Sequence, residues 1–329
     1  MSSIREVARV AGVSTATVSR VLNDDRTYKM TDETRRRVRS AAESLGYAIP
    51  RKDASGGIKI GCVLCVTKDK YEDPFYMSIL SGIEEQLSQE GLSLTFLKTF
   101  MELEDEAVLA NTLSTGITGV ILMEALNDHI YGYLRPRVPY LVGIDTQREE
   151  IDNIGYDHYR VSGMMTRHLI EKGHTRIAYT GGSGETGNIR CSKRFQGFSN
   201  TMAIHDLPVR PEWVMDCRWD EELCIEQVKQ LVRQPDRPTA IFAASDIVAM
   251  ATLSALYSQK VRVPDEMAVI GLSDIDMAKY SNPPLTTIRI PTREIGMVAV
   301  KTLLARIQGD TSLPRGITLP GTLVVRDST

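Results

Sequence analysis

Short apolar runs alternate with amphipathic segments along most of this chain, and the alternation constrains its fold more than any other feature. Runs typical of buried strands are IKIGCVLCV, LSLTFLKTF, GVILME, PYLVGID, RIAYTGG, TAIFAAS and MAVIGLS. Helical segments such as YMSILSGIEEQLSQEG and HYRVSGMMTRHLIEKG lie between them. Strands alternating with helices predict doubly wound parallel sheets, which bind ligands at the carboxyl ends of their strands. Because the series is too long for one open sheet, we expect two similar lobes.

The first fifty residues differ from this body in pattern and in charge. Residues 1–52 carry a net charge of +5, whereas residues 53–329 carry −8. A small basic segment joined to an acidic body is expected when one domain meets a polyanion, although so small an excess can also arise by chance.

The basic segment predicts a helix-turn-helix unit followed by a third helix. Gly12 ends the first helix, Ser14 can cap the second, and Thr31 can cap the third, which Gly46 ends. Apolar side chains at helical spacing predict one shared small core. Its expected members are Ile4, Val7, Ala8, Val10, Ala11, Val13, Val18, Val21, Leu22, Val38, Ala41, Ala42 and Leu45.

In a helix-turn-helix unit the start of the second helix faces base edges in the major groove. Here these residues are Thr15, Ala16 and Thr17, with Arg20 one turn further along. Hydroxyl and methyl groups can read base edges and thymine methyls, and Ser14 and Ser19 suit phosphate contacts. Spacing alone also permits a merely hydrophilic capped helix.

Several motifs resemble the LacI/GalR family of bacterial transcription regulators over nearly the full length. They are VARVAGVSTATVSRVLN and TDETRRRVRSAAESLGY in the head, and GHTRIAYTGG, KRFQGF, TAIFAASDIVAM, MAVIGLSDID and PPLTTIRIPTREIG in the body. The resemblance implies that Thr15, Ala16 and Arg20 read bases as half of a symmetric dimer. It also implies the two-lobed fold of periplasmic binding proteins, with crossings near Tyr156, Arg289 and Pro320.

We therefore expect an all-α helix-turn-helix domain at 1–48, a linker at 49–57 and an α/β effector-binding and dimerisation domain at 58–329. Its first lobe would span about 58–156 and 289–318, and its second about 157–288 and 319–329. The complete set predicted for DNA contact is Ser14, Thr15, Ala16, Thr17, Ser19, Arg20, Asn23, Arg51 and Lys52.

The linker departs from the family pattern, in which a hinge-helix leucine enters the minor groove. The segment YAIPRKDASGGIKIG has no leucine, and Pro50, Gly56 and Gly57 disfavour a stable helix, so a leucine-driven DNA kink is not expected. Arg51 and Lys52 can track phosphates, and a bare flexible tether is the equal alternative.

Polar residues at predicted strand ends are candidates for binding a sugar between the lobes. Carboxylates and a guanidinium can make paired hydrogen bonds to vicinal hydroxyls, while aromatic rings stack on the sugar face. The candidates are Asp73, Phe75, Tyr76, Asp145, Arg194, Trp219, Ser245 and Asp274. The family motifs imply the strongest effector positions for Asp145 and Arg194. Capping roles for Asp73 and Asp246, and a core position for Trp219, remain open.

Other motifs do not support catalysis. The phosphate-loop-like run GGSGETGN has Asn188 where a lysine belongs, and Cys62 and Cys65 lie in an apolar strand. The five cysteines are typical of buried, reduced thiols. We expect no enzyme activity, cofactor or metal ion, and no Gly-x-Gly-x-x-Gly motif opens a dinucleotide site.

The expected function is a cytoplasmic, dimeric repressor that binds pseudopalindromic operator DNA and is released by a small-molecule sugar effector. No run reaches the length of a membrane span, and no signal peptide is recognisable at the start. The segments VLNDDRTYKMTDETRRRV and EDPFYMSILSGIEEQL resemble the galactose and β-galactosidase operon repressor subgroup, which favours galactose or a β-galactoside. A pentose, a purine or a phosphorylated partner protein is the alternative regulator, and a sugar-transport component fits least.

Overall fold

The computed structural model describes residues 4–22, 30–44, 57–65, 73–124, 128–146, 148–183 and 187–329. The chain forms two compact units, Met1–Ile58 and Lys59–Thr329, called here the head and the body.

The head contains three helices, α1 (Ile4–Ala11), α2 (Thr15–Leu22) and α3 (Asp32–Ser44). Gly12 follows α1 with a φ of +66°, a left-handed conformation that costs glycine little. The Ser14 hydroxyl accepts a hydrogen bond from the Thr17 amide at 3.1 Å, and the Thr31 hydroxyl accepts one from the Thr34 amide at 3.3 Å. The predicted helix caps are thereby confirmed.

A small apolar core joins the three helices. Its buried members are Val7, Ala8, Ala11, Val18, Val21, Val38, Ala41 and Ala42, with Val13 and Met30 packed against them. Val10 was also expected there, but it lies on the outward side of α1 and is 50% exposed. The side chains of Ile4, Leu22 and Leu45 lie outside the described part of the chain.

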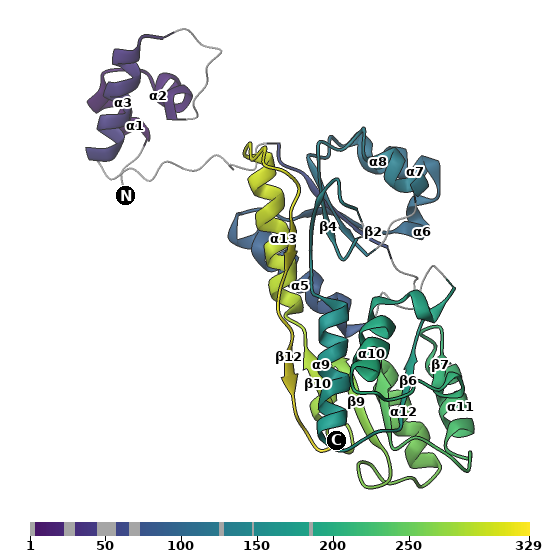
Figure 1. The fold of residues 1–329 in the computed structure, drawn as a ribbon. Coiled ribbons are helices and arrows are strands. Elements are labelled where there is room, and N and C mark those ends of the chain that lie inside the picture. The colour runs from purple at the N-terminus through teal and green to yellow at the C-terminus, as the bar shows by residue number, and fades with distance from the viewer. Residues whose placement is uncertain are drawn as a thin grey trace. The chain divides into compact units, whose positions relative to one another are not determined.

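Two six-stranded sheets organise the body (Figure 1). The first has the order β11-β5-β4-β3-β1-β2 with all strands parallel: β1 (Ile60–Leu64), β2 (Leu94–Thr99), β3 (Gly119–Met123), β4 (Tyr140–Ile144), β5 (Asp152–Gly155) and β11 (Gly316–Thr318). The second has the order β12-β10-β9-β8-β6-β7: β6 (Ile177–Gly181), β7 (Val214–Asp216), β8 (Ala240–Ala243), β9 (Ala268–Ser273), β10 (Thr286–Arg289) and β12 (Thr322–Val324). Among the described strands, only β12 runs antiparallel to its neighbour.

Each sheet and its helices form one lobe, and the chain passes between the lobes after β5, β10 and β11. Lobe 1 carries α5 (Pro74–Gln89), α6 (Phe100–Leu103), α7 (Glu106–Ser114), α8 (Asp128–Leu134) and α13 (Thr292–Ile307). Lobe 2 carries α9 (His158–Glu171), α10 (Lys193–Ile204), α11 (Glu221–Leu231) and α12 (Asp246–Ser258), with short 3-10 turns η2 (Ile189–Cys191), η3 (Pro211–Trp213) and η4 (Asp276–Lys279). The two-lobed α/β class is confirmed.

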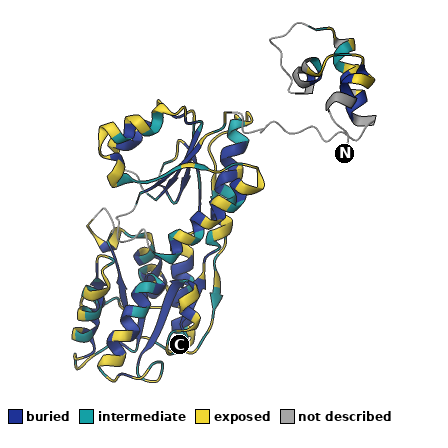
Figure 2. Ribbon diagram, turned by 180° about the vertical axis from the view of Figure 1, so that it is seen from behind, coloured by how far each residue is buried: buried dark blue, intermediate teal, exposed yellow. Residues whose placement is uncertain are grey.

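The central strands are almost entirely buried because helices cover both faces of each sheet (Figure 2). All residues of β1, β3 and β6 are buried. Helices α5 and α13 run side by side in lobe 1, where a Cβ on Gly82 would lie 2.0 Å from the Arg293 carbonyl oxygen (Figure 1). Glycine therefore permits their close approach. Among the described residues, no helix is long and apolar enough to span a membrane.

Candidate functional site

Three strands of lobe 1 end on the same edge, and a polar residue follows each of them directly. Glu124 follows β3, Asp145 follows β4 and Tyr156 follows β5. Glu124 and Asp145 have φ values of +69° and +51°, so both depart from the backbone conformation that ordinary residues prefer. Such conformations concentrate at ligand sites, where the surrounding fold holds them. This edge is where a doubly wound sheet binds ligands.

Arg194, in the first turn of α10 in lobe 2, contacts the residues at this edge. Its Nη2 donates to the Tyr156 hydroxyl at 2.8 Å, and its Nε donates to His158 Nδ1 at 3.2 Å. Its Nη1 donates to the carbonyl of Ala244, directly after β8, at 3.3 Å. The guanidinium is thus held at the carboxyl end of the second sheet.

His158 connects Arg194 to lobe 1. Its Nε2 lies 3.3 Å from Asp145 Oδ1, and its ring stacks on Tyr156 with centroids 4.0 Å apart. Tyr76, in the first turn of α5, donates its hydroxyl proton to Glu124 Oε1 at 3.0 Å. We call these six residues the interlobe cluster: Tyr76, Glu124, Asp145, Tyr156, His158 and Arg194.

The interlobe cluster perturbs its own ionisable groups. Burial and the charge of Asp145 raise the pKa of Glu124, and they outweigh the opposing charges of His158 and Arg194. Burial and Glu124 likewise raise the pKa of Tyr76. Shifts of this kind, in a place where strand ends converge, are typical of binding sites.

Trp219 lies beside the cluster and is partly buried. Its indole covers Gly182, where a Cβ would lie 2.3 Å from the ring, and the Arg194 Cζ is 5.3 Å from the ring centroid. The same side chain packs against the hydrophobic core of lobe 2. Trp219 therefore belongs to the edge of the lobe 2 core, the alternative position that its sequence left open, and it also lies beside Arg194.

Four other candidates have structural tasks. Asp73 caps α5 by accepting from the Phe75 amide at 2.9 Å, and Phe75 is buried with its ring edge-on to Tyr76 and Tyr156. Ser245 caps α12, although Asp246 was the residue considered for that cap. Asp246 is instead buried and accepts from the Thr287 hydroxyl at 2.6 Å and the Ile275 amide at 2.9 Å. The stacking role expected for Phe75 does not fit its burial.

Asp274 does not join the interlobe cluster. Arg289 Nε lies 2.7 Å from one of its carboxylate oxygens, and Arg326 Nη2 lies 2.6 Å from the other. Arg289 ends β10 and Arg326 follows β12, so Asp274 ties together two segments that border the lobe crossings. This geometry favours a structural role over the effector contact that we expected.

Sequence reasoning missed Glu124, Tyr156 and His158 as site residues. Glu124 carries the same signal as Asp145, since both are acidic residues placed directly after a buried parallel strand. No local pattern distinguishes His158, because its polar partners Asp145 and Arg194 are 13 and 36 residues away in sequence.

The head places its predicted DNA-binding residues on and around α2. Thr15 is exposed, whereas the Ser14 and Thr17 hydroxyls lie 2.9 Å apart in the cap. Ala16, Ser19 and Arg20 lie in α2, but their side chains are outside the described part. Asn23, Arg51 and Lys52 also lie outside it, together with the leucine-free linker.

Two sequence motifs resolve as structural features. Asn188 in the GGSGETGN run caps η2, and residues 184–186 of that run lie outside the described part. Cys62, Cys217 and Cys224 are buried as expected, whereas Cys65 is partly exposed and Cys191 is exposed. The expectation of uniformly buried thiols is therefore wrong for two of them.

Comparison with known proteins assigns both units. Residues 3–49 match the family model "Bacterial regulatory proteins, lacI family", and residues 166–329 match "Periplasmic binding protein-like domain". The chain is 31% identical over 333 residues to the transcriptional repressor PurR of Photobacterium profundum, covering 100% of this chain and 98% of the relative. It is also 31% identical over 345 residues to the transcriptional repressor MelR of Bacillus subtilis, covering 100% and 97%.

Among solved structures, the transcriptional regulator CelR in complex with cellobiose superimposes with a TM-score of 0.73 at 26% identity, over the full length of both chains. The curated relatives are repressors and not enzymes. The chain belongs to the LacI family of bacterial transcriptional regulators.

Proposed function

We propose that this repressor binds a pseudopalindromic operator as a homodimer and that a neutral sugar bound at the interlobe cluster releases it. The observation that carries the proposal is the interlobe cluster, which sets hydrogen-bond acceptors and donors at the carboxyl ends of both sheets. Effector and operator then compete through a coupling free energy of about 1–3 kcal/mol.

The chemistry of the cluster favours a hydroxyl-rich ligand. Glu124 and Asp145 supply carboxylate oxygens that accept from hydroxyls, and Arg194 supplies N–H groups that donate to them. The Trp219 ring supplies a surface for stacking beside Arg194. Two carboxylates at one edge repel a phosphorylated or carboxylated ligand, so the neutral sugar is preferred.

Galactose or a β-galactoside is the effector we favour within this class. The support is the resemblance of the head and α5 segments to galactose and β-galactosidase operon repressors. The complex of CelR with cellobiose is an instance of the same fold binding a disaccharide. Similarity to PurR repressors makes a nucleobase the competing effector to include in every titration.

DNA recognition is assigned to the start of α2. Thr15 is exposed there, and the amides of a helix N-terminus suit a phosphate contact. Ala16, Thr17 and Arg20 complete the predicted base-reading set. Ser14, Ser19, Arg51 and Lys52 are the predicted backbone contacts, and Asn23 is a further predicted DNA contact. Replacing Thr15 by alanine should weaken specific binding more than binding to unrelated DNA.

The decisive test is a fluorescence-anisotropy titration of a duplex from the gene's own promoter at one stated salt concentration. Galactose, lactose, allolactose, melibiose, cellobiose, glucose, ribose and hypoxanthine are then added separately. We expect release by a galactose-type sugar, loss of that release in Arg194→Ala, and unchanged DNA affinity in the same variant.

Arg262→Ala is the matched control, because Arg262 is an exposed arginine of lobe 2 whose partners are Asp265 and Glu266, close to it in sequence. It should respond to sugar like the unmodified protein. Release by hypoxanthine alone would replace the sugar with a nucleobase. Binding that no compound alters would contradict the effector proposal and leave DNA binding intact.

A further inference from the structure

The contacts of His158 determine which of its ring nitrogens accepts a hydrogen bond and which one donates. A guanidinium can only donate, so Nδ1 must be the acceptor of the Arg194 Nε–H bond at 3.2 Å. In the neutral ring the proton then lies on Nε2, which faces Asp145 Oδ1 at 3.3 Å. Arg194, His158 and Asp145 therefore form a donor-to-acceptor relay from lobe 2 to lobe 1.

The surroundings fix the orientation of this ring. Tyr156 stacks on it with an interplanar angle of 27°, and the Tyr156 hydroxyl accepts from Arg194 Nη2. Asp157 caps α9 at the Arg160 amide, which holds the backbone beside His158. Tyr156 and His158, both at the first lobe crossing, thus accept hydrogen bonds from the same Arg194 guanidinium.

We propose that His158 is a positioning residue: its neutral form holds Arg194 at the proposed effector site and links it to Asp145, and its protonation releases Arg194. Protonation places a hydrogen on Nδ1, which removes the acceptor and sets two cations against each other. The charged and titratable groups that face His158 are Asp145 and Glu124 from lobe 1, Arg194 from α10, and Tyr156.

This inference rests on the proposed function only in treating the interlobe cluster as the effector site. If it holds, effector affinity falls as the pH is lowered, because Arg194 leaves the position in which it donates to the ligand. Its test can be made without DNA or effector, so that failure of either proposal is recognised separately.

Trp219 provides that test. The chain has two tryptophans, and the other, Trp213, is buried with an Nε1 that has no hydrogen-bond partner in the described part of the chain. Trp213→Phe therefore removes no hydrogen bond and leaves Trp219, 5.3 Å from Arg194 Cζ, as the sole tryptophan fluorophore. Its emission maximum and acrylamide quenching report whether the guanidinium remains in place.

Three full-length proteins in the Trp213→Phe background are compared from pH 8 to pH 5.5: unmodified His158, His158→Gln and His158→Leu. Glutamine can accept from Arg194 and donate to Asp145 but does not titrate, whereas leucine can do neither. We expect the glutamine variant to match His158 at pH 8 and to lose the pH dependence. The leucine variant should differ at pH 8, with circular dichroism confirming that it is folded.

The proposal is overturned if the glutamine variant keeps the pH profile of His158, or if all three proteins give the same emission and quenching. The comparison of His158 with His158→Gln is sufficient on its own should the leucine variant not fold. If none of the sugars releases the protein from DNA but the fluorescence behaves as expected, the relay is supported and only the proposed effector is contradicted.

Discussion

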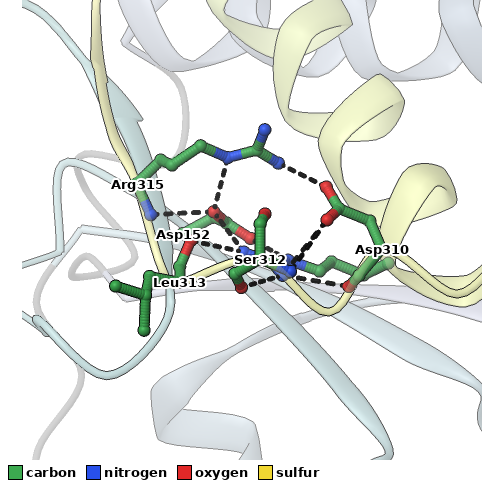
Figure 3. Close-up of polar contacts among 6 residues, drawn as sticks. Asp152, Asp310, Ser312, Leu313 and Arg315 are labelled. Atoms are coloured by element: carbon green, nitrogen blue, oxygen red, sulfur yellow. Dashed lines mark hydrogen bonds and ion pairs between the residues drawn. The ribbon is translucent and has the colours of Figure 1, made fainter.

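Arg306 binds both carboxylate oxygens of Asp152 across 154 residues of sequence, with Nε 2.5 Å from Oδ2 and Nη2 2.9 Å from Oδ1 (Figure 3). The same guanidinium donates to the carbonyls of Asp310, Ser312 and Leu313, so all five of its N–H groups are used. This contact holds the loop between α13 and β11 against the start of β5. It fixes the segment that leads to the third lobe crossing.

Arg306→Lys should destabilise the body by about 3 kcal/mol, because a lysine has three donors and leaves the buried Asp152 carboxylate partly unpaired. Thermal unfolding followed by circular dichroism measures the loss. Arg315→Lys is the matched control, since Arg315 also faces Asp152 but is about half exposed, and it should cost at most about 1 kcal/mol. Equal losses for the two variants would contradict the role assigned to Arg306.

Asp246 should make stability depend on pH. Burial raises its pKa to about 6 in the folded protein, against about 3.9 in an unfolded chain. The folded state therefore binds the proton more tightly than the unfolded state does. Protonation of Asp246 stabilises the fold as the pH falls through 6, and this contribution is lost as the pH rises above 6. Between pH 7 and pH 5 the gain should be about 1.4 kcal/mol.

Urea unfolding at pH 7 and pH 5, in the unmodified protein and in Asp246→Asn, isolates this contribution. Other titrating groups are common to both proteins and cancel in the difference. The stability difference between the two proteins should shift by that amount between the two pH values. A difference that stays constant would show that Asp246 is ionised at both.

The extent to which the sequence predicted this molecule follows from the range of the interactions involved. Strands such as GVILM and helix caps such as Ser14 are local patterns, and the structure confirms them. Capping of α12 was considered for Asp246 rather than its neighbour Ser245, because either residue type can cap and only the backbone geometry decides.

Long-range partners were beyond such patterns. Asp274 pairs with Arg326, 52 residues away, and His158 reaches Arg194 across 36 residues. Nothing near either residue in sequence indicates these contacts, since the fold alone brings them together. Glu124 is the exception, because an acidic residue directly after a buried parallel strand is a usable signal, which was applied to Asp145 and Asp274 but not to Glu124.

The contact between α5 and α13 should not tolerate a methyl group. A Cβ at position 296 would lie 2.2 Å from the Ile79 carbonyl oxygen, so Gly296→Ala should separate the helices and cost about 1–3 kcal/mol. Gly132→Ala is the control, since Gly132 lies in α8 with no atom within 4 Å of its added Cβ. It should be neutral or slightly stabilising in the same thermal unfolding assay.

The position of the Trp219 side chain should depend on Gly182. Gly182→Ala places a methyl group where the indole lies, so we expect Trp219 to move away from Arg194 and its emission to shift. Under the proposed function, the sugar concentration needed for operator release should rise about tenfold, which corresponds to about 1.4 kcal/mol. Operator affinity without sugar should stay the same. Unchanged sugar response together with a shifted emission would show that Trp219 does not contact the effector.

The proposed dimer should depend on exposed aromatic residues of lobe 2. Tyr257 at the end of α12 and Tyr280 after η4 are 81% and 79% exposed, and exposed tyrosines are typical of protein interfaces. Changing both to aspartate should convert a dimer to a monomer in size-exclusion chromatography with light scattering. Because a monomer engages one half-site, operator affinity should fall by at least about tenfold. Leu313→Asp is the control, since Leu313 is equally exposed on the loop held by Arg306 in lobe 1 and should leave the dimer intact. A double variant that remains dimeric would place the interface elsewhere on the body.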